Sequence, residues 1–204
     1  MKIVGIPFEL TTKHPESWIF DESASRLNAR ALPHSDFYIN PAGAESIDAE
    51  SLSNATTLLG TPPSGDFQFI SRINVGFKSL FDAGVLMIWI DETHWVKFCF
   101  EFSPAKKPMV VSVVTSGLSD DSNAFTVDSE EIWYRIARQG HVYALHSSFD
   151  GITWELIRVF SLGLDTSHHL LGFEAQSPTG DGCSITFDQI QFKSERLVDF
   201  RDGS

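Results

Sequence analysis

Apolar residues recur at every second position through much of residues 64–115, and this alternation constrains the fold more than any other feature of the sequence. The clearest runs are residues 66–70, 81–90, 95–102 and 109–115, and the breaks between them contain Gly, Pro or Asp. A period of two places successive side chains on opposite faces of a β-strand. The stretch therefore predicts a meander of antiparallel strands, which needs a second sheet to cover its apolar face.

Similar short runs on both sides of this meander can supply the second sheet. We expect further strands at residues 18–20, 26–31, 36–39, 132–138, 141–149, 152–157, 170–176 and 183–192. Residues 40–63 and 117–124 are polar or rich in Pro, Gly and Ser, and we expect loops there. The sequence predicts an all-β, antiparallel two-sheet sandwich formed by a single domain over residues 1–193, followed by a polar C-terminal tail at 194–204.

Charge argues against some classes of partner. The chain has 15 Lys and Arg against 27 Asp and Glu, a formal net charge of −12. A surface that binds nucleic acid or an anionic membrane needs clustered basic residues, and the nearest such cluster is the pair Lys106 and Lys107.

The longest apolar run, residues 85–90, is far shorter than the roughly 20 residues that span a bilayer. The N-terminus lacks the apolar run of a signal peptide. We therefore expect a cytoplasmic protein that binds neither nucleic acid nor membrane.

The two cysteines, Cys99 and Cys183, are far apart in strand-like runs. A secreted scaffold held by disulfides would carry more cysteines. Buried free thiols are therefore the expected state of both.

The strand at residues 95–102 offers the most informative face for binding. Trp95, Lys97, Cys99 and Glu101 fall on the face opposite the apolar one. One interpretation is a solvated face on which Lys97 and Glu101 form cross-strand pairs. The other is a ligand groove, in which an exposed Trp95 lies beside charged groups and Arg135 contributes a further cation.

Catalytic and metal sites are not expected. A glycoside hydrolase needs two carboxylates that flank the scissile bond, and the nearest candidate, residues 128–131, lacks the required spacing. The polar residues 119–123 do not follow the calcium-loop pattern. The adjacent pair His168 and His169 would point to opposite faces of a strand, so these residues cannot chelate one ion. The sequence predicts no catalytic residue, no metal and no cofactor.

Several motifs, taken in order along the chain, resemble those of a known family. They are residues 36–38, 65–67, 81–87, 95–97 with Glu101, 112–115, 132–138, 148–154 and 176–178. Together they resemble a widespread, poorly characterised family with a concanavalin A-like lectin/glucanase jelly-roll fold. The resemblance implies two curved sheets with a concave face. Asp120 and Gln176, which lie in or beside these motifs, complete a candidate ligand-binding set with Trp95, Lys97, Glu101 and Arg135.

What the resemblance implies about function leaves two main alternatives. A fungal member of the family is named for the regulation of enolase, which implies a non-catalytic cytoplasmic regulator of enolase expression or activity that acts by binding a protein, such as enolase or another metabolic enzyme. The alternative is a lectin-like module that binds a carbohydrate or another small polar ligand, and a glycoside hydrolase is less favoured than either. The name favours the protein-binding alternative. One position departs from the family, because Asp121 stands where members usually carry an aromatic residue.

Overall fold

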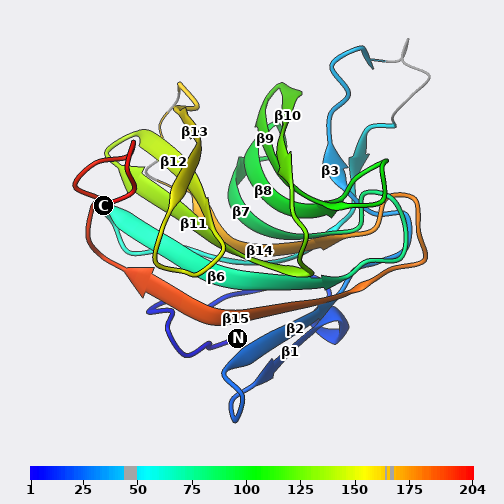
Figure 1. The fold of residues 1–204 in the computed structure, drawn as a ribbon, viewed down its shortest axis with the longest axis horizontal. Coiled ribbons are helices and arrows are strands. Elements are labelled where there is room, and N and C mark those ends of the chain that lie inside the picture. Colours follow the sequence, from blue (N-terminus) through cyan, green and yellow to red (C-terminus); the bar gives the residue numbers. More distant parts are fainter. Residues whose placement is uncertain (44–49, 164, 166–167) are drawn as a thin grey trace.

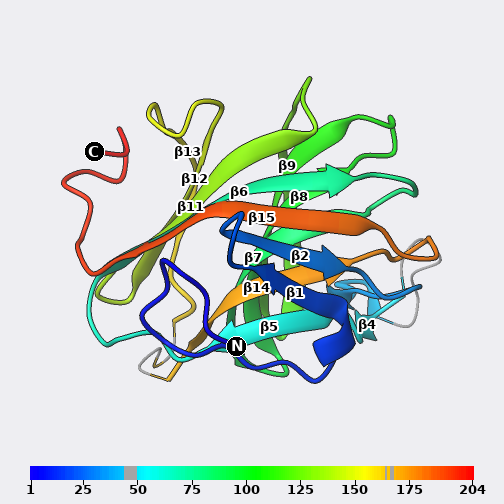
Figure 2. The same cartoon turned by 90° about the horizontal axis from the view of Figure 1, so that it is seen from below.

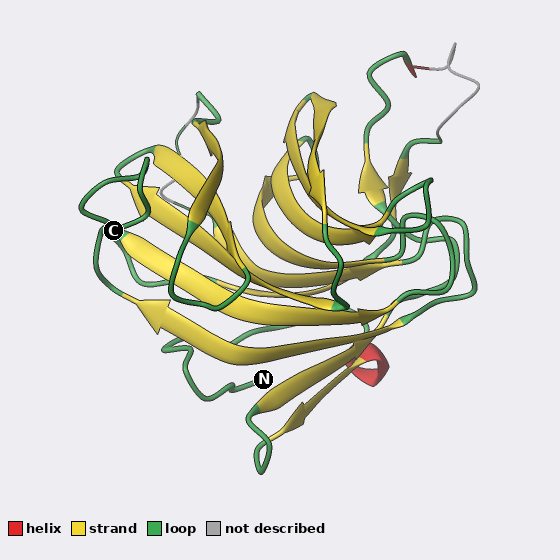
Figure 3. Cartoon of the chain, viewed as in Figure 1, coloured by secondary structure: helices red, strands yellow, loops and turns green. Residues whose placement is uncertain are grey.

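The computed structural model describes residues 1–43, 50–163, 165 and 168–204. These residues form two antiparallel β-sheets stacked face to face, with little helix beyond the short 3₁₀ turn η1 (Pro15–Ser17) (Figures 1 and 3). The all-β sandwich predicted from the alternation is confirmed.

The first sheet has seven strands in the order β1-β2-β15-β6-β11-β12-β13. Seen from below, it lies across the whole molecule (Figure 2). In chain order these strands are β1 (Trp18–Asp21), β2 (Arg26–Arg30), β6 (Phe67–Gly76), β11 (Glu131–Gln139), β12 (Val142–Ser148), β13 (Glu155–Phe160) and β15 (Ser184–Lys193).

The second sheet has six strands in the order β10-β9-β8-β7-β14-β5. It is strongly curved, and its concave face looks away from the first sheet toward the short hairpin β3–β4 (Figure 1). The strands are β5 (Thr56–Gly60), β7 (Ala83–Asp91), β8 (His94–Phe102), β9 (Pro108–Ser116), β10 (Leu118–Thr126) and β14 (Leu170–Gln176), and the hairpin comprises β3 (Phe37–Tyr38) and β4 (Leu52–Ser53).

Phe and other large apolar side chains from both sheets fill the space between them. On β8 the alternation works as predicted, because Val96, Phe98 and Phe100 join this core and the residues between them do not. Across the core, Phe98 stacks on Tyr134 of β11 with ring centroids 3.7 Å apart. The Tyr134 hydroxyl donates a 2.8 Å hydrogen bond to the carbonyl of Cys99, so one residue links the two sheets by both kinds of contact.

Two expectations about the meander need correction. Residues 66–70, expected as its first strand, fall almost wholly in β6 of the other sheet, which extends to Gly76, so the chain crosses the core between β6 and β7. Residues 117–124 do not form a loop but most of strand β10, which pairs with β9. Strand β10 is an edge strand with most side chains exposed, so no apolar alternation marks it in the sequence.

Residues 40–63 were expected to form a loop, and this was wrong at their C-terminal end. Strand β5 pairs there with β14 and forms the other edge of the curved sheet. Both Cys99 and Cys183 are free and buried, as expected. Within the described ranges, no helix is long and apolar enough to cross a membrane.

Candidate functional site

A strap, residues 35–40, crosses the concave face of the six-stranded sheet. At one end Ser35 exchanges two 3.2 Å backbone hydrogen bonds with Ser177, just after β14. At the other end Ile39 accepts a backbone hydrogen bond from Ser119 of β10, and its own amide donates to the Ser119 hydroxyl, both at 2.9 Å. The strap thus runs from the end of β14 to β10, across β7, β8 and β9, and covers the middle of the concave face.

Beneath the strap, a buried cation fastens it to the sheet. Lys97 is only 2% exposed, and its Nζ donates to Asp36 Oδ1 at 2.5 Å and to Gln176 Oε1 at 2.9 Å. Asp36 is itself fixed, because its backbone amide and carbonyl both bond to Asn54. Gln176 donates onward to the carbonyl of Phe81 at 3.1 Å. The ion pair therefore connects the strap with β8 and β14.

Three further carboxyl groups, those of Glu101, Asp121 and Glu174, lie near this pair and interact electrostatically with the one cation, Lys97. We call the set Asp36, Lys97, Glu101, Asp121, Glu174 and Gln176 the Lys97 cluster. Burial raises the pKa of Glu101 and of Glu174 to about 8 in each case, and it raises the pKa of Asp121 as well. Lys97 opposes these shifts, and the pKa of Lys97 is itself raised by Asp36 and Glu174 against the effect of its burial.

Glu174 is the least satisfied member of the cluster. It is fully buried, and within the described part of the chain neither carboxyl oxygen has a hydrogen-bond partner. An ionised carboxylate in such a position is costly, and the raised pKa favours the protonated form of Glu174. As a neutral acid it can donate a hydrogen bond.

The cluster brings together Lys97, Glu101 and Gln176, three of the six residues predicted to bind a ligand. Trp95 lies on the same face, but its predicted exposure is wrong. Its side chain is 1% exposed because Phe37 of the strap packs against it with ring centroids 5.9 Å apart. A ligand cannot stack directly on Trp95 in this arrangement.

Asp120 and Arg135 do not belong to this face. Asp120 points away from it and pairs with Arg158 of β13 at 2.6 Å, because neighbouring residues of a strand face opposite sides. Asp121, its neighbour, takes the place on the concave face. Arg135 lies on β11 in the other sheet, and its guanidinium is on the outer face of that sheet. Their predicted positions on the concave face are wrong, since alternation along one strand cannot show which sheet a distant strand joins.

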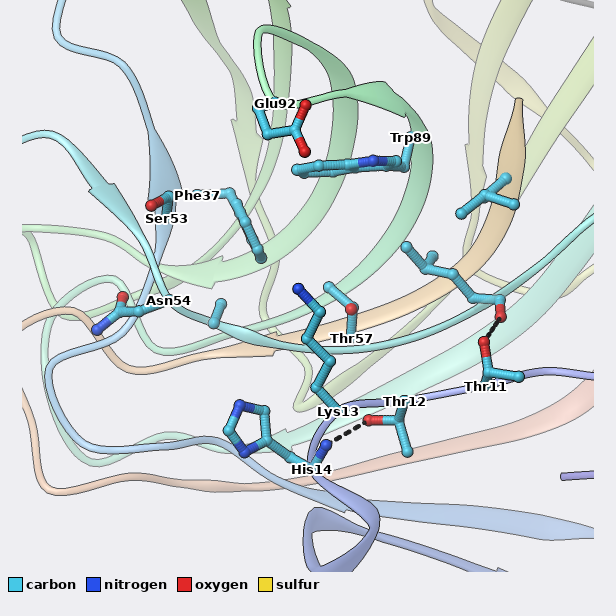
Figure 4. Close-up of a pocket in the computed structure, with 13 residues that line it drawn as sticks. Thr11, Thr12, Lys13, His14, Phe37, Ser53, Asn54, Thr57, Trp89 and Glu92 are labelled. Atoms are coloured by element: carbon cyan, nitrogen blue, oxygen red, sulfur yellow. Dashed lines mark hydrogen bonds between the residues drawn. The ribbon is translucent and has the colours of Figure 1, made fainter. Parts of the chain in front are cut away.

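On the other side of Phe37, a pocket of about 500 Å³ opens at the edge of the curved sheet (Figure 4). We call it the Trp89 pocket. Trp89 is half-buried, stacks on Trp95 at 5.5 Å with an interplanar angle of 8°, and meets Phe37 edge-on at 5.3 Å. These two contacts hold the indole rigidly while leaving part of it accessible to the pocket. Leu59 and Leu170 extend its apolar wall.

Polar groups from distant segments surround this aromatic wall. Lys13 reaches the pocket from the N-terminal segment, which is held to β5 by the backbone pairing of Thr11 with Leu59 (Figure 4). Glu92 comes from the β7–β8 turn, and neither charged group has an ionic partner among the described residues. Asn54 and Thr57 add an amide and a hydroxyl. A flat apolar wall with several polar groups at its rim suits a small ligand that has both kinds of surface.

Sequence reasoning missed Trp89, Asp36 and Glu174. The first could have been found, because a hairpin that turns at residues 91–94 places Trp89 directly opposite Trp95. Asp36 belongs to the motif at residues 36–38, but nothing local shows that it or Glu174 contacts Lys97. Asp36 reaches Lys97 from 61 positions away, and Glu174 reaches it from a strand that returns late in the chain.

The described residues contain no group of three or more His, Cys, Asp or Glu side chains placed to hold a metal ion.

A family model described as "Protein of unknown function (DUF1349)" matches residues 12–195. The chain belongs to this family. The match includes the strap, the Lys97 cluster and every residue that lines the Trp89 pocket except Thr11.

A named relative of this DUF1349 chain is "Regulation of enolase protein 1" of Saccharomyces cerevisiae. The two are 31% identical over 132 residues, which span 64% of this chain and 66% of that protein, slightly less than two thirds of each. The resemblance predicted from the motifs is confirmed. A solved structure of a functionally unknown protein from Saccharomyces cerevisiae is also similar, with a TM-score of 0.79, 25% identity and coverage of 93% and 98% of the two chains.

More distant solved structures share the jelly-roll sandwich alone. The GH43 protein BlXynB of Bacillus licheniformis aligns with a TM-score of 0.68 and 12% identity, over 91% of this chain and 36% of that one. The carbohydrate-binding module CBM66 of Bacillus subtilis aligns with a TM-score of 0.55 and 12% identity, over 95% and 99%. The predicted concanavalin A-like fold is confirmed. At these identities the structural similarity does not indicate a shared catalytic or binding function.

Proposed function

We propose that this chain is a non-catalytic binding module that holds a carbohydrate, or a closely similar polyhydroxylated molecule, in the Trp89 pocket. The observation that carries this proposal is the half-exposed Trp89 ring, held between Trp95 and Phe37 at the wall of a pocket of about 500 Å³. A sugar ring presents C–H groups on its faces and hydroxyl groups at its edge. Its faces can pack on the indole while its hydroxyls reach Lys13, Glu92, Asn54 and Thr57.

The Lys97 cluster has a supporting role in this proposal. Asp36 and Phe37 are adjacent in the strap, so the ion pair of Asp36 with Lys97 sets the position of the Phe37 ring against Trp89. A rigid aromatic wall loses little conformational entropy when a ligand binds. Lys97, Glu101 and Gln176 therefore act on the ligand mainly through the strap.

A carbohydrate array tests the proposal directly. The wild-type protein is probed against monosaccharides and oligosaccharides, and each positive is measured by calorimetry with Trp89→Ala and Trp133→Ala. Trp133 is the matched control, since it is also a partly exposed tryptophan but lies against Gly151 on the other sheet. We expect a roughly tenfold or greater loss of affinity for Trp89→Ala and none for Trp133→Ala. Equal affinities for all three proteins would overturn the proposal.

Regulation of a metabolic enzyme through protein binding is a second candidate. It is favoured by the name of the yeast relative and by the net charge of −12, which suits a basic partner surface. In this version the protein works in the cytoplasm and binds enolase directly. Purified enolase should then be retained by the immobilised protein at low salt and released at high salt, because surface charges are screened. Absence of retention at low salt would rule out this direct contact, and Trp89→Ala should leave it unchanged.

A further inference from the structure

A buried arginine lies on the outer face of the seven-stranded sheet, away from the pocket already described. Arg135 of β11 is 4% exposed there, and in the described part of the chain no carboxylate lies within ion-pair distance of its guanidinium. Buried charges in proteins are almost always paired, because transfer of an unpaired ion out of water is costly. Burial alone lowers the pKa of Arg135 to about 10, so the side chain remains a cation at neutral pH.

Arg72 on the same outer face shows what a paired guanidinium looks like in this sheet. Its Nε and Nη2 donate to the two carboxylate oxygens of Asp188 at 2.8 and 2.7 Å, and its Nη1 donates to Glu131 at 3.0 Å. Arg72 is nevertheless more exposed than Arg135. The more deeply buried arginine is therefore the one without an anion.

Neutral groups partly solvate the Arg135 guanidinium. Its Nη2 donates to the carbonyl of Gly203 at 2.7 Å, its Nη1 makes a long 3.4 Å contact with Gln68 Oε1, and its plane lies over the Trp154 ring at 4.4 Å. The Nε atom has no partner among the described residues. The Gln68 contact is weak because it is long, and the Gly203 carbonyl and the Trp154 ring supply no negative charge.

The C-terminal segment, which ends beside the β11–β12 side of the sheet (Figure 1), contacts this arginine through the Gly203 carbonyl, and we call residues 197–203 the cover. Besides the Gly203 carbonyl, the Phe200 carbonyl lies 2.8 Å from Nε2 of His146, the cross-strand neighbour of Arg135. Leu197 and Gly203 are buried, but Val198 is 91% exposed and Asp199, Arg201 and Asp202 are also exposed. Because few side chains anchor the segment, lifting it costs little apolar contact.

We propose that Arg135, Gln68 and Trp154 form a binding site for an oxyanion, a carboxylate or phosphate group of a small molecule, and that residues 197–203 are its cover. A guanidinium binds such groups through two parallel N–H···O bonds. The carbonyl of Gly203 occupies the place that an anionic oxygen takes when the cover lifts, and the Phe200 carbonyl leaves His146 at the same time. Trp154 offers an apolar surface to the rest of the ligand.

Anion-dependent stability of the full chain tests this site. Thermal unfolding and calorimetry are recorded with sodium phosphate and with sodium succinate, against sodium chloride at equal ionic strength. We expect saturable stabilisation by one or both oxyanions and none by chloride. Arg135→Met should remove the response, with a fall in affinity of roughly 10- to 100-fold, whereas Arg138→Met, a more exposed arginine of the same strand, should keep it.

A substitution in the cover supplies a second test that does not depend on Arg135→Met folding. A side chain at Gly203 would meet Arg135 Nη2 and Trp154 Cβ at 2.8 Å each, at a backbone φ of +75°. Gly203→Val should therefore lift the cover and raise oxyanion affinity several-fold. The proposal is overturned if phosphate and succinate act no differently from chloride, if Arg135→Met responds like the wild type, or if Gly203→Val leaves the affinity unchanged.

Discussion

Lys97 and Asp36, 61 residues apart in the sequence, form an ion pair in which Nζ lies 2.5 Å from Oδ1. The pair fastens the strap to the concave face and is almost fully shielded from water, since the Lys97 side chain is 2% exposed and that of Asp36 is 16% exposed. It sets the position of Phe37 and, through Phe37, the shape of the Trp89 pocket.

Removal of the cation should be strongly destabilising. Lys97→Met leaves Asp36 and the surrounding carboxyl groups without their positive charge, and the loss of one partner of a buried pair costs about 3–5 kcal/mol. Urea unfolding of the variant and of Lys107→Met, an exposed lysine, measures the difference. The control should lie within about 0.5 kcal/mol of the wild type. A similarly small effect for Lys97→Met would mean that the pair does not hold the strap.

Stability should fall as the pH rises from about 5 to 8. The pKa of Glu174 is raised from 4.5 to about 8, so in this range the folded state holds a proton that the unfolded state has lost. Stability then declines by up to about 1.4 kcal/mol per pH unit for this group. Glu174→Gln cannot ionise and should show a shallower decline. Urea midpoints from pH 5 to 9 test this, and parallel curves for the two proteins would contradict it.

The turn between β12 and β13 should not tolerate a side chain at Gly151. This residue has a φ of +73°, and an added Cβ would lie 2.9 Å from the Trp133 ring. Gly140, in the preceding turn, has a φ of +61° but open space around it. Gly140→Ala should cost about 1 kcal/mol for the backbone alone, and Gly151→Ala roughly 1 kcal/mol more for the displaced ring. Chemical unfolding of the two variants gives the comparison, and equal costs would show that Trp133 moves freely.

Much of the sandwich could be predicted because its strands are half-buried and alternate cleanly. Strand β8 is the clearest case, with Val96, Phe98 and Phe100 in the core and Lys97 on the opposite face. Strand β10 escaped prediction for the opposite reason. Its residues at 120–123 are all polar, so no apolar alternation marks them, and the strand forms by backbone pairing with β9.

The candidate site could be predicted only in part, because its geometry depends on long-range packing. Alternation placed Trp95 and Lys97 on one face, but the strap that buries Trp95 comes from 55–60 residues earlier in the chain. The same pattern could not show that Arg135 belongs to the other sheet. The partly exposed tryptophan is Trp89. Antiparallel pairing of β7 with β8 across their turn would have placed it beside Trp95.

The most direct test of the Trp89 pocket uses the five tryptophan indole N–H signals in a proton–nitrogen correlation spectrum. Substitution of each tryptophan in turn assigns the signals, and the protein is then titrated with the carbohydrates that bind on the array. We predict that the Trp89 signal shifts most, that Trp95 follows through the stack, and that Trp133 and Trp154 on the other sheet do not move. No shift at Trp89, or shifts confined to Trp133 and Trp154, would contradict the account.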